Sequence, residues 1–404
     1  MSTISASTTS TTGYVVTSDT TGTLVLQTGV TPTTAVTVAS NQQVTFAQPA
    51  NLPNTFGFKN RIINGAMVID QRNAGASVTP VDNGFVVDRY KFEMSQASKF
   101  TAQQNQGGVT PPAGFTNYLG ITSSSAYSVG ASEQFIFYQP IEGFNVADLG
   151  WGTANAQTVT LSFWVRSSLT GTFGGSLRNS AANRSYPFSY SISSANTWTA
   201  VYITIPGDTT GTWLTNNGVG VLVIFSLGTG TTRSGTAGAW SGSNFVSATG
   251  ATSVVGTNGA TFYITGVQLE RGSTATSFDF RPYGTELALC QRYLPAWNWV
   301  SGNDNVGFGY SVSTGTSLIN VAIPVTPRIA PTGVTASAMT NFVLRNGSNT
   351  GGTPTAIAIN VGSSQANQSL SVTTTAGTPT IAAGQGAFLF ANGTAQILFT
   401  GCEL

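Results

Sequence analysis

The sequence contains no histidine and only two cysteines. Histidine is the most frequent general base and the most frequent metal ligand in proteins. Its absence therefore excludes Ser-His-Asp and Cys-His catalytic arrangements and the usual zinc sites. Cys290 and Cys402 cannot form a disulfide framework, and we expect both to be free buried thiols. The sequence predicts no metal site and no cofactor.

Charged residues are also scarce. They make up 7% of the 404 residues, against about 25% in an average soluble domain. The net charge is +1 and no basic run occurs, which argues against a groove for nucleic acid. A nearly neutral surface does little to keep copies of a protein apart. We therefore expect much of this surface to be buried in an obligate homo-oligomer.

Long apolar stretches are missing as well. No run of about 18 apolar residues is present, so the sequence predicts no membrane insertion. The first ten residues lack the charged and apolar regions of a signal peptide. We expect the protein to be made and assembled in a cytoplasm.

What the sequence has in abundance is glycine, at 47 positions, together with Thr, Ser and Asn between short alternating segments. Residues 158–166 alternate most clearly, and their apolar side chains on one face are Val159, Leu161, Phe163 and Val165. Residues 219–227 are apolar on both faces, as in a strand that is covered on both sides. Short strands at this spacing predict an all-β protein centred on a jelly-roll-like antiparallel β-sandwich.

Residues 261–294 combine a strand, a charged turn and a short helix without filler. Phe262 and Ile264 have one parity, whereas Val267 and Leu269 have the other. The inward face is kept only if Gly266 inserts an extra residue, so the sequence predicts a β-bulge there. We expect Phe278 and Phe280 to restart a strand.

A short helix is predicted to follow that second strand, with Thr285 as its cap. Leu287, Cys290 and Leu294 form its apolar side.

Three domains are predicted, at residues 1–56, 57–295 and 296–404. The first contains short Thr-rich strands with too little apolar surface for a core of their own, so we expect copies to intertwine. A disordered Ser/Thr tail is the alternative for residues 1–12. Residues 48–58, which contain Pro49 and Pro53, are typical of a linker. The third is predicted to be a small distal β domain.

Specific motifs in residues 57–295 resemble a known family. They are NRIINGAMVIDQRNAG at 60–75, VDRY at 87–90, GVQLE at 266–270 and FRPYGTELALCQRY at 280–293. The chain resembles bacteriophage virion proteins that are described as tail fibre or receptor-binding proteins. The resemblance implies a location in the virion and an amino terminus that attaches to other virion proteins. It also implies a homotrimer, because fibres of this type are commonly threefold.

One outer face is the candidate binding surface. Trp164 and Arg166 project from the side opposite the core on their strand, as do Trp198 and Tyr202 on theirs. Flat aromatic rings beside polar groups can stack on the sugar rings of a host glycan. The same row can instead pack against a neighbouring subunit. The sequence leaves both interpretations open.

The charged residues also have two interpretations. Asp88 with Glu270 or Asp279 could form the carboxylate pair of a glycoside hydrolase. Because each carboxylate has a basic neighbour in the sequence, we favour a structural ion-pair network. Its members are Arg61, Asp88, Arg89, Glu270, Asp279 and Arg281.

The leading hypothesis is a non-enzymatic, homotrimeric fibre or spike protein that binds host-surface glycans or another receptor through multivalent contact. A structural head fibre or capsid decoration protein is the first alternative, and a polysaccharide depolymerase is the second.

Overall fold

The structure of the chain is a computed structural model. It describes residues 2–5, 15–17, 21–28, 31, 33–41, 44–46, 58–300, 302–349, 351–360, 369–376 and 381–404. Most of the predicted linker, at 48–57, and most of the predicted Ser/Thr tail, at 1 and 6–12, lie outside the described residues. The chain forms two compact units, Met1–Phe56 and Gly57–Leu404.

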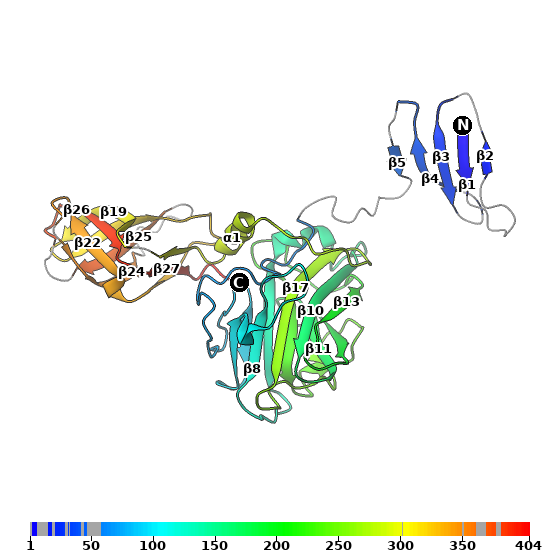
Figure 1. The fold of residues 1–404 in the computed structure, drawn as a ribbon, viewed down its shortest axis with the longest axis horizontal. Helices are drawn as coiled ribbons and strands as arrows, with labels where there is room; N and C mark the ends of the chain where they lie inside the picture. The colour runs from blue at the N-terminus through cyan, green and yellow to red at the C-terminus, as the bar shows by residue number, and fades with distance from the viewer. Residues whose placement is uncertain are drawn as a thin grey trace. The chain divides into compact units, whose positions relative to one another are not determined.

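The amino-terminal unit contains one five-stranded sheet with the order β2-β1-β3-β4-β5 (Figure 1). Its strands are β1 Ser2–Ser5, β2 Val15–Thr17, β3 Leu24–Thr28, β4 Thr33–Val38 and β5 Val44–Phe46. The pairing of β1 with β3 is parallel, and the other pairs are antiparallel. The predicted short strands are present. Their intertwining with other copies stays a prediction.

The second unit begins with a β-sandwich, which confirms the predicted fold class. One sheet has the order β13-β10-β17-β8-β7, and the other has the order β12-β11-β14-β9-β6 (Figure 1). All neighbouring strands in both sheets are antiparallel. The inner faces of the two sheets share one large apolar core, to which Phe163 and Phe225 both belong.

The strand bounds of the sandwich are β6 Lys91–Met94, β7 Phe100–Gln104, β8 Leu119–Ser123, β9 Gln134–Glu142, β10 Val159–Ser167, β11 Gly171–Arg178, β12 Ser185–Ile192, β13 Thr199–Ile205, β14 Val219–Thr229 and β17 Thr261–Arg271. Two short strands, β15 Ser234–Gly235 and β16 Ser247–Ala248, pair in parallel. Three 3₁₀ turns lie at Gln106–Gly108, Gly143–Asn145 and Ala147–Leu149.

The alternation predicted for β10 is confirmed, because Val159, Leu161, Phe163 and Val165 are all buried in the core. The prediction for β14 is also confirmed. Its Val223 belongs to the main core, whereas its Ile224 packs on the opposite side of the sheet in a second apolar cluster.

The predicted bulge in β17 is confirmed. The pairing of β10 with β17 shifts register between Ser162 and Trp164, and Gly266 has a φ of 63°. Glycine adopts this left-handed backbone conformation at little energetic cost, because it has no Cβ atom. The bulge keeps Ile264 and Val267 in the same core although their parities differ.

Some predicted elements are wrong. The alternating side chains of residues 86–92 predict a strand, but the strand begins only at Lys91, because Arg89 has a φ of 75° and interrupts the extended backbone. Phe278 and Phe280 belong to no strand. The Gly-, Ser- and Asn-rich segment between β10 and β13 is predicted from its composition to be a loop, but it contains β11 and β12. Gly175 of β11 is packed so closely that an added Cβ would lie 2.4 Å from the Phe188 ring.

The predicted helix is present as α1 Tyr283–Gln291, but its predicted cap is wrong. Pro282 occupies the N-cap position, and the backbone N–H of Thr285 donates to the carbonyl of Pro282. Cys290 is buried in a small cluster with Ile63, Ile69 and Tyr293. Both cysteines are free and buried, as predicted.

Residues 296–404 form two further sheets around their own apolar core. A three-stranded sheet has the order β18-β27-β21, and a seven-stranded sheet has the order β23-β22-β26-β19-β20-β25-β24. The bounds are β18 Ala296–Trp299, β19 Asp304–Ser313, β20 Thr316–Ala322, β21 Gly333–Ala336, β22 Phe342–Asn346, β23 Gly351–Gly352, β24 Pro354–Ile359, β25 Ser369–Ala376, β26 Gly386–Ala391 and β27 Ala395–Thr400, with a 3₁₀ turn at Met339–Asn341.

These sheets are tied to the sandwich by polar contacts. Arg72 pairs with Glu403, and the Gln396 amide donates to the Gln71 carbonyl at 2.7 Å. The predicted domain boundary at residue 296 is therefore crossed by direct contacts, and independent folding of the carboxy-terminal part stays a prediction.

An irregular segment at residues 59–71 connects the two sheets of the sandwich through buried amide side chains. The Asn60 side chain accepts from the Leu269 N–H at 3.0 Å and donates to the Val267 carbonyl at 3.1 Å. Gln139 of β9 accepts from and donates to the backbone of Ile63, both at 2.7 Å. Because a buried backbone group without a partner costs about 1–3 kcal/mol, these side chains are needed for the segment to adopt its path.

Asn64 is the most heavily used of these amides. It is fully buried, has a φ of 59°, and its side chain exchanges hydrogen bonds with Ile69 N–H and carbonyl and donates to the Asp88 carbonyl. Its backbone N–H donates to the Glu286 carboxylate of α1. One residue therefore joins this segment to two other parts of the unit.

We predict that Asn64→Ala lowers the free energy of unfolding by about 3 kcal/mol, because three buried hydrogen bonds of about 1 kcal/mol each are lost. The matched control is Asn83→Ala. Asn83 has nearly the same backbone conformation, with a φ of 61°, but its side chain is exposed and bonds only Asp82 among its described contacts. Chemical denaturation should show a small effect for the control. Equal losses for the two variants would contradict the role given to Asn64.

Candidate functional site

The outer face of the first sandwich sheet carries a hollow of about 250 Å³, here called the trough. Trp164 of β10 and Tyr202 of β13 line it, and both point away from the core because their strand neighbours Phe163 and Val201 are buried. In the ladder, Tyr202 pairs with Ser162, and Trp164 pairs with Ala200. The two aromatic side chains are therefore adjacent on the outer face of the sheet.

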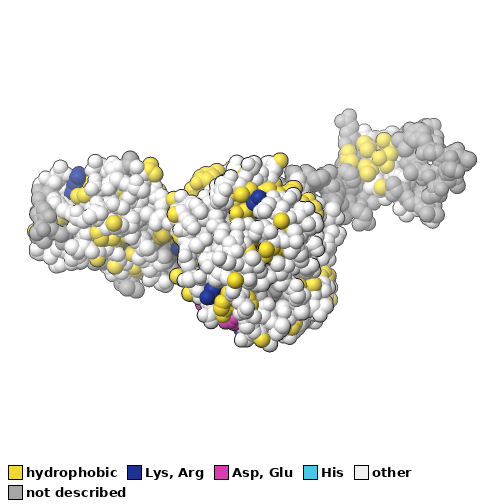
Figure 2. Space-filling model, turned by 60° about the horizontal axis from the view of Figure 1, so that its bottom comes forward, with side chains coloured by type: hydrophobic (Ala, Val, Ile, Leu, Met, Phe, Trp, Pro, Cys, Tyr) yellow, Lys and Arg dark blue, Asp and Glu magenta, His cyan; other side chains and the backbone are white. Residues whose placement is uncertain are grey.

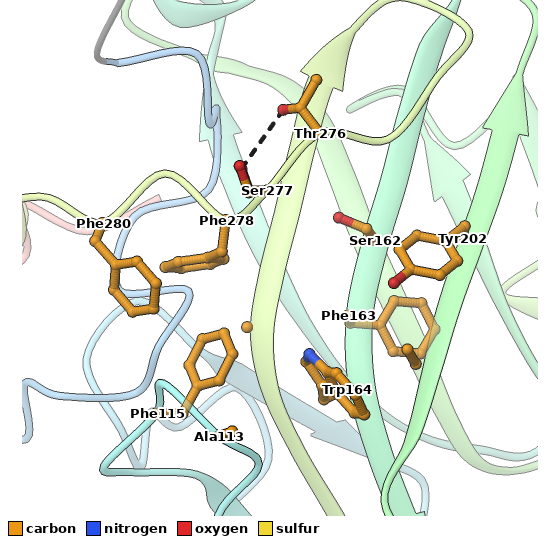
Figure 3. A pocket seen from close by; sticks show the side chains of 12 residues that line it. Ala113, Phe115, Ser162, Phe163, Trp164, Tyr202, Thr276, Ser277, Phe278 and Phe280 are labelled. Atoms are coloured by element: carbon orange, nitrogen blue, oxygen red, sulfur yellow. Dashed lines mark hydrogen bonds between the residues drawn. The ribbon is translucent and has the colours of Figure 1, made fainter. Parts of the chain in front are cut away.

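Three phenylalanines form the opposite wall of the trough (Figure 3). The ring centroids of Phe115 and Phe278 are 5.1 Å apart, those of Phe115 and Phe280 are 5.3 Å apart, and those of Phe278 and Phe280 are 4.7 Å apart. Mutual packing of this kind holds each ring in place without a strand. Phe280 nevertheless remains 57% exposed.

The floor of the trough is the bulge of β17. A Cβ added at Gly266 would lie 2.7 Å from the Phe115 ring and 3.2 Å from the Trp164 ring. Gly266 therefore has two roles in the trough. It permits the left-handed backbone conformation, and it leaves room between the two aromatic walls. Hydroxyl groups at the trough come from Ser162, Tyr202, Thr276 and Ser277, and no charged side chain lines it.

The other two predicted binding residues have different positions. The Trp198 indole donates to the Thr110 carbonyl at 2.9 Å and packs edge-on against Tyr118. Arg166 donates to the Asn196 carbonyl at 2.8 Å, and its guanidinium lies 5.4 Å from the Tyr263 ring centroid. Neither lines the trough. Of the four predicted residues, the structure brings Trp164 and Tyr202 together in this hollow.

Sequence reasoning missed Phe115, Phe278 and Phe280 as parts of the site. Phe278 and Phe280 were interpreted as an inward-facing strand, and Phe115 lies in a Gly/Pro-rich segment without periodicity. Phe115 lies 163 positions before Phe278 in the sequence. The local pattern around Phe278 and Phe280 therefore could not predict that Phe115 packs against them. Only the tertiary structure brings the three rings together.

A second hollow of about 230 Å³ lies on the other side of the same wall and is lined by Phe115, Phe278 and Phe280. Ala66 and Val68 add apolar surface, and Arg281 and Glu286 form its charged border. This Arg and Glu form an ion pair at 3.3 Å, with side chains that are 5% and 9% exposed. The pair is also used structurally, because Arg281 donates to the Ile62 and Asn60 carbonyls.

The six residues predicted to form an ion-pair network do not pair with one another in the described structure. Arg61 pairs with Asp148 at 2.7 Å, and Arg281 pairs with Glu286. Asp279 accepts from the Asn60 N–H at 3.2 Å. Direct ion pairs among the six are therefore replaced by bonds to uncharged donors and to other partners.

Glu270 and Arg89 show the same use of uncharged partners. Glu270 accepts from Gln268 and from the backbone and hydroxyl groups of Thr276. Arg89 is buried, donates to the Pro140 carbonyl at 2.5 Å, and has its guanidinium 3.5 Å from the Tyr293 ring centroid. Arg89 and Glu270 therefore stabilise the segments that contain the motifs VDRY and GVQLE.

The protonation of Asp88 is strongly perturbed. Burial raises the pKa of Asp88 to about 7, although hydrogen bonds from the Gln71 side chain and backbone act to lower it. A raised pKa was not expected from the sequence. Asp88 is only 3% exposed and lines neither hollow, so a polysaccharide has no access to its carboxyl group.

The described residues contain no cluster of three or more Cys, Asp and Glu side chains that could hold a metal ion. None of the helices in the described part of the chain is both long and apolar enough to cross a membrane.

No protein-family model matches the chain, and no curated protein matches it. Among solved structures, the enzymatically active domain of bacteriophage CBA120 tailspike protein 4 aligns with 12% identity and a TM-score of 0.31 over 53% of this chain and 22% of the tailspike chain. The chain thus spans about a fifth of that protein.

Two smaller proteins also align. TmCBM61 in complex with β-1,4-galactotriose has 9% identity and a TM-score of 0.27, covering 53% of this chain and 99% of its own. The family 11 carbohydrate-binding module of the Clostridium thermocellum cellulase Lic26A-Cel5E has 10% identity and a TM-score of 0.25, covering 50% and 99%. Likeness at this level carries no argument about what the chain binds.

We predict that Asp88→Asn changes the pH dependence of stability. Between about pH 4 and pH 7 the unfolded chain releases the Asp88 proton while the folded chain keeps it, so wild-type stability falls as the pH rises. Asp88→Asn has no such proton. The stability of the variant relative to wild type should therefore rise across this window and level off above pH 7 in denaturation curves.

The control with the opposite sign is Asp208→Asn. Burial acts to raise the pKa of Asp208, but bonds from Arg184 and Thr210 together hold it below its usual value. Wild type should therefore lose stability relative to this variant as the pH falls below about 4. The same slope for both variants would contradict the assignment of Asp88.

Proposed function

We propose that this chain is a receptor-binding subunit of a bacteriophage fibre or spike and that the trough holds a sugar ring of the host surface. The observation that carries the proposal is the trough itself, whose aromatic walls come from Trp164, Tyr202 and the three phenylalanines, with Tyr202 and Phe280 exposed and the other rings half-buried. Aromatic faces pack well against the C–H groups of a sugar ring, and hydroxyl groups at the edge can bond the sugar hydroxyls.

The lining favours an uncharged sugar. The trough has Ser162, Thr276 and Ser277 beside its aromatic rings but no charged group, and Arg166, which could have bound an acidic sugar, is directed to Asn196 and Tyr263. A carboxylate or phosphate entering the trough would lose hydration without gaining a partner of opposite charge. We therefore assign neutral hexoses or their neutral derivatives as the ligand class.

The proposed action is binding without catalysis. Asp88, Glu270 and Asp279 are the candidate acids for hydrolysis, and none of them lines the trough. Each accepts hydrogen bonds that serve the fold, as described above. A general acid must reach the glycosidic oxygen, so these positions support a role in adhesion.

A volume of about 250 Å³ is below the usual size of a small-molecule pocket, which is about 300–1,000 Å³. One trough therefore gives weak binding, and several copies on one particle are needed for firm attachment. We propose a homotrimer whose amino-terminal unit joins it to other virion proteins. The shortage of charge supports close packing of copies, and Figure 2 shows mostly uncharged polar surface on the visible described face.

We predict that Trp164→Ala and Tyr202→Ala each weaken binding to host-surface polysaccharide about tenfold, which corresponds to about 1.4 kcal/mol of lost stacking and burial. Calorimetry with purified polysaccharide measures the affinity, and labelling of host cells measures the attachment. Phe144→Ala and Tyr283→Ala are the controls, because these side chains are 61% and 63% exposed and lie outside the trough. They should bind as wild type does.

Failure has distinct forms. Wild-type protein that labels no host cell and binds no surface polysaccharide would favour a head fibre or capsid decoration protein. Release of reducing ends from the polysaccharide by wild-type protein would show a depolymerase. Equal binding by the trough variants and the controls would remove the trough as the site.

A further inference from the structure

The seven-stranded sheet of residues 304–391 has one covered face and one open face. Ile319, Leu344 and Leu389 point inward and belong to the apolar core, which Ile397 and Phe399 of β27 complete from the three-stranded sheet. Their strand neighbours must point outward, because side chains alternate along a strand. The open face is therefore defined by the outward positions of β19, β20, β22, β24 and β26.

Large apolar side chains are concentrated on the middle of this open face. Phe308 and Tyr310 of β19 are 64% and 54% exposed, and Phe388 of β26 is 36% exposed. Phe308 pairs directly with Phe388, and Tyr310 pairs with Gly386, so the three rings form one continuous group. We call this group the bulky strip.

Towards the β24 edge the same face becomes shallow. Ala356 and Ala358 of β24 are exposed, and Asn320 and Ala322 of β20 are exposed between them and the bulky strip. We call the two alanines of β24 the shallow strip. The described outward side chains are therefore large on the bulky strip and small on the shallow strip.

The exposed apolar area is comparable to the largest apolar patch on a typical monomer, which is often functional. At about 200 Å² for a whole aromatic side chain, the three rings alone expose about 300 Å². An apolar patch of this size on a monomer is commonly an interaction site. It also supplies over a third of the roughly 800 Å² that each partner buries in a stable interface.

The scarcity of charged side chains on the open face indicates which kind of partner it binds. The outward described positions of these strands include one charged residue, Arg345, and its guanidinium lies over the Phe390 ring at 5.4 Å. A charged partner would find few counter-charges here. The shallow strip of a second copy consists of Ala356 and Ala358, which carry no charge and leave room for the large rings of a bulky strip.

We infer that the open face of the seven-stranded sheet is the surface that joins copies of this chain, with the bulky strip of one copy packed on the shallow strip of the next. A contact between two different halves of one face is repeated from copy to copy and closes into a ring, which in the proposed homotrimer contains three copies. The inference deepens the proposed multivalent function, on which its biological meaning rests, by naming the contact between subunits.

The first experiment is the oligomeric mass of the full chain by light scattering. Wild type should be trimeric, and the double variant Phe308→Asp/Tyr310→Asp should have the mass of one chain. The control is Phe144→Asp/Tyr283→Asp, which places the same changes at a phenylalanine and a tyrosine that are 61% and 63% exposed on another part of the unit. This control should stay trimeric. Monomeric wild-type protein, or a trimeric first variant, would overturn the inference.

A second experiment does not depend on the stability of the aspartate variants. Tyr310, Leu318, Thr373 and Ala358 are paired in one row across β19, β20, β25 and β24. Three strand spacings of about 4.8 Å separate the row's ends, too far for a disulfide within one chain. The native thiols are buried. Tyr310→Cys/Ala358→Cys should therefore form covalent oligomers under mild oxidation, whereas neither single variant should.

Absence of covalent oligomers from the double cysteine variant would overturn the packing of bulky on shallow strips, as would linkage in either single variant. Sugar affinity is measured separately. The monomeric aspartate variant should keep the single-trough affinity of wild type but label host cells at least tenfold less well. Loss of sugar binding in every protein, with the oligomer results as expected, would contradict the proposed function and leave this inference standing.

Discussion

The hydrogen bonding of buried amide side chains to the irregular segment at residues 59–71 is the constraint on which the second unit depends. This segment forms no strand of its own, and its backbone bonds to β17, such as Arg61 N–H to the Leu269 carbonyl at 2.8 Å, are supplemented by side-chain partners from Asn60, Asn64 and Gln139. Buried backbone groups left without partners would cost about 1–3 kcal/mol each. The segment in turn joins the sandwich to α1, because the Asn64 N–H donates to Glu286.

The same network reaches the trough. The Val267 N–H donates to the Gly65 carbonyl at 2.9 Å, and the Val267 carbonyl accepts from the Asn60 amide at 3.1 Å. Gly65 has no room for a side chain, because an added Cβ would lie 2.1 Å from that carbonyl. The bulge at Gly266 is therefore held from behind by the irregular segment, and the bulge is the floor between the aromatic walls. The segment at residues 59–71 and the proposed binding site therefore lie on opposite sides of β17.

Several of the few charged groups of this chain form ion pairs at buried carboxylates. Arg292 forms two hydrogen bonds with Glu142, at 2.7 and 2.9 Å, and Arg184 does the same with Asp208 at 2.7 Å. Both carboxylates are almost fully buried. Because charged residues are few and some of them are used in this way, most of the outer surface carries uncharged side chains. Such a surface favours contacts with sugars and with other copies of the chain over contacts with highly charged partners.

The sequence by itself determined the all-β class, the inward face of β10, the double-sided burial of β14 and the bulge at Gly266, because parity along a strand is a local property. It did not reveal β11 and β12, because the glycines of β11 are placed by close packing against other strands. It also predicted ion pairs where buried amides act instead, since sequence neighbours do not reveal spatial partners. Only the tertiary structure separated Trp164 and Tyr202 from Arg166 and Trp198, and only it brought Phe115 to Phe278 and Phe280. A binding surface is assembled from residues far apart in the chain, and chain folding alone decides which of them meet.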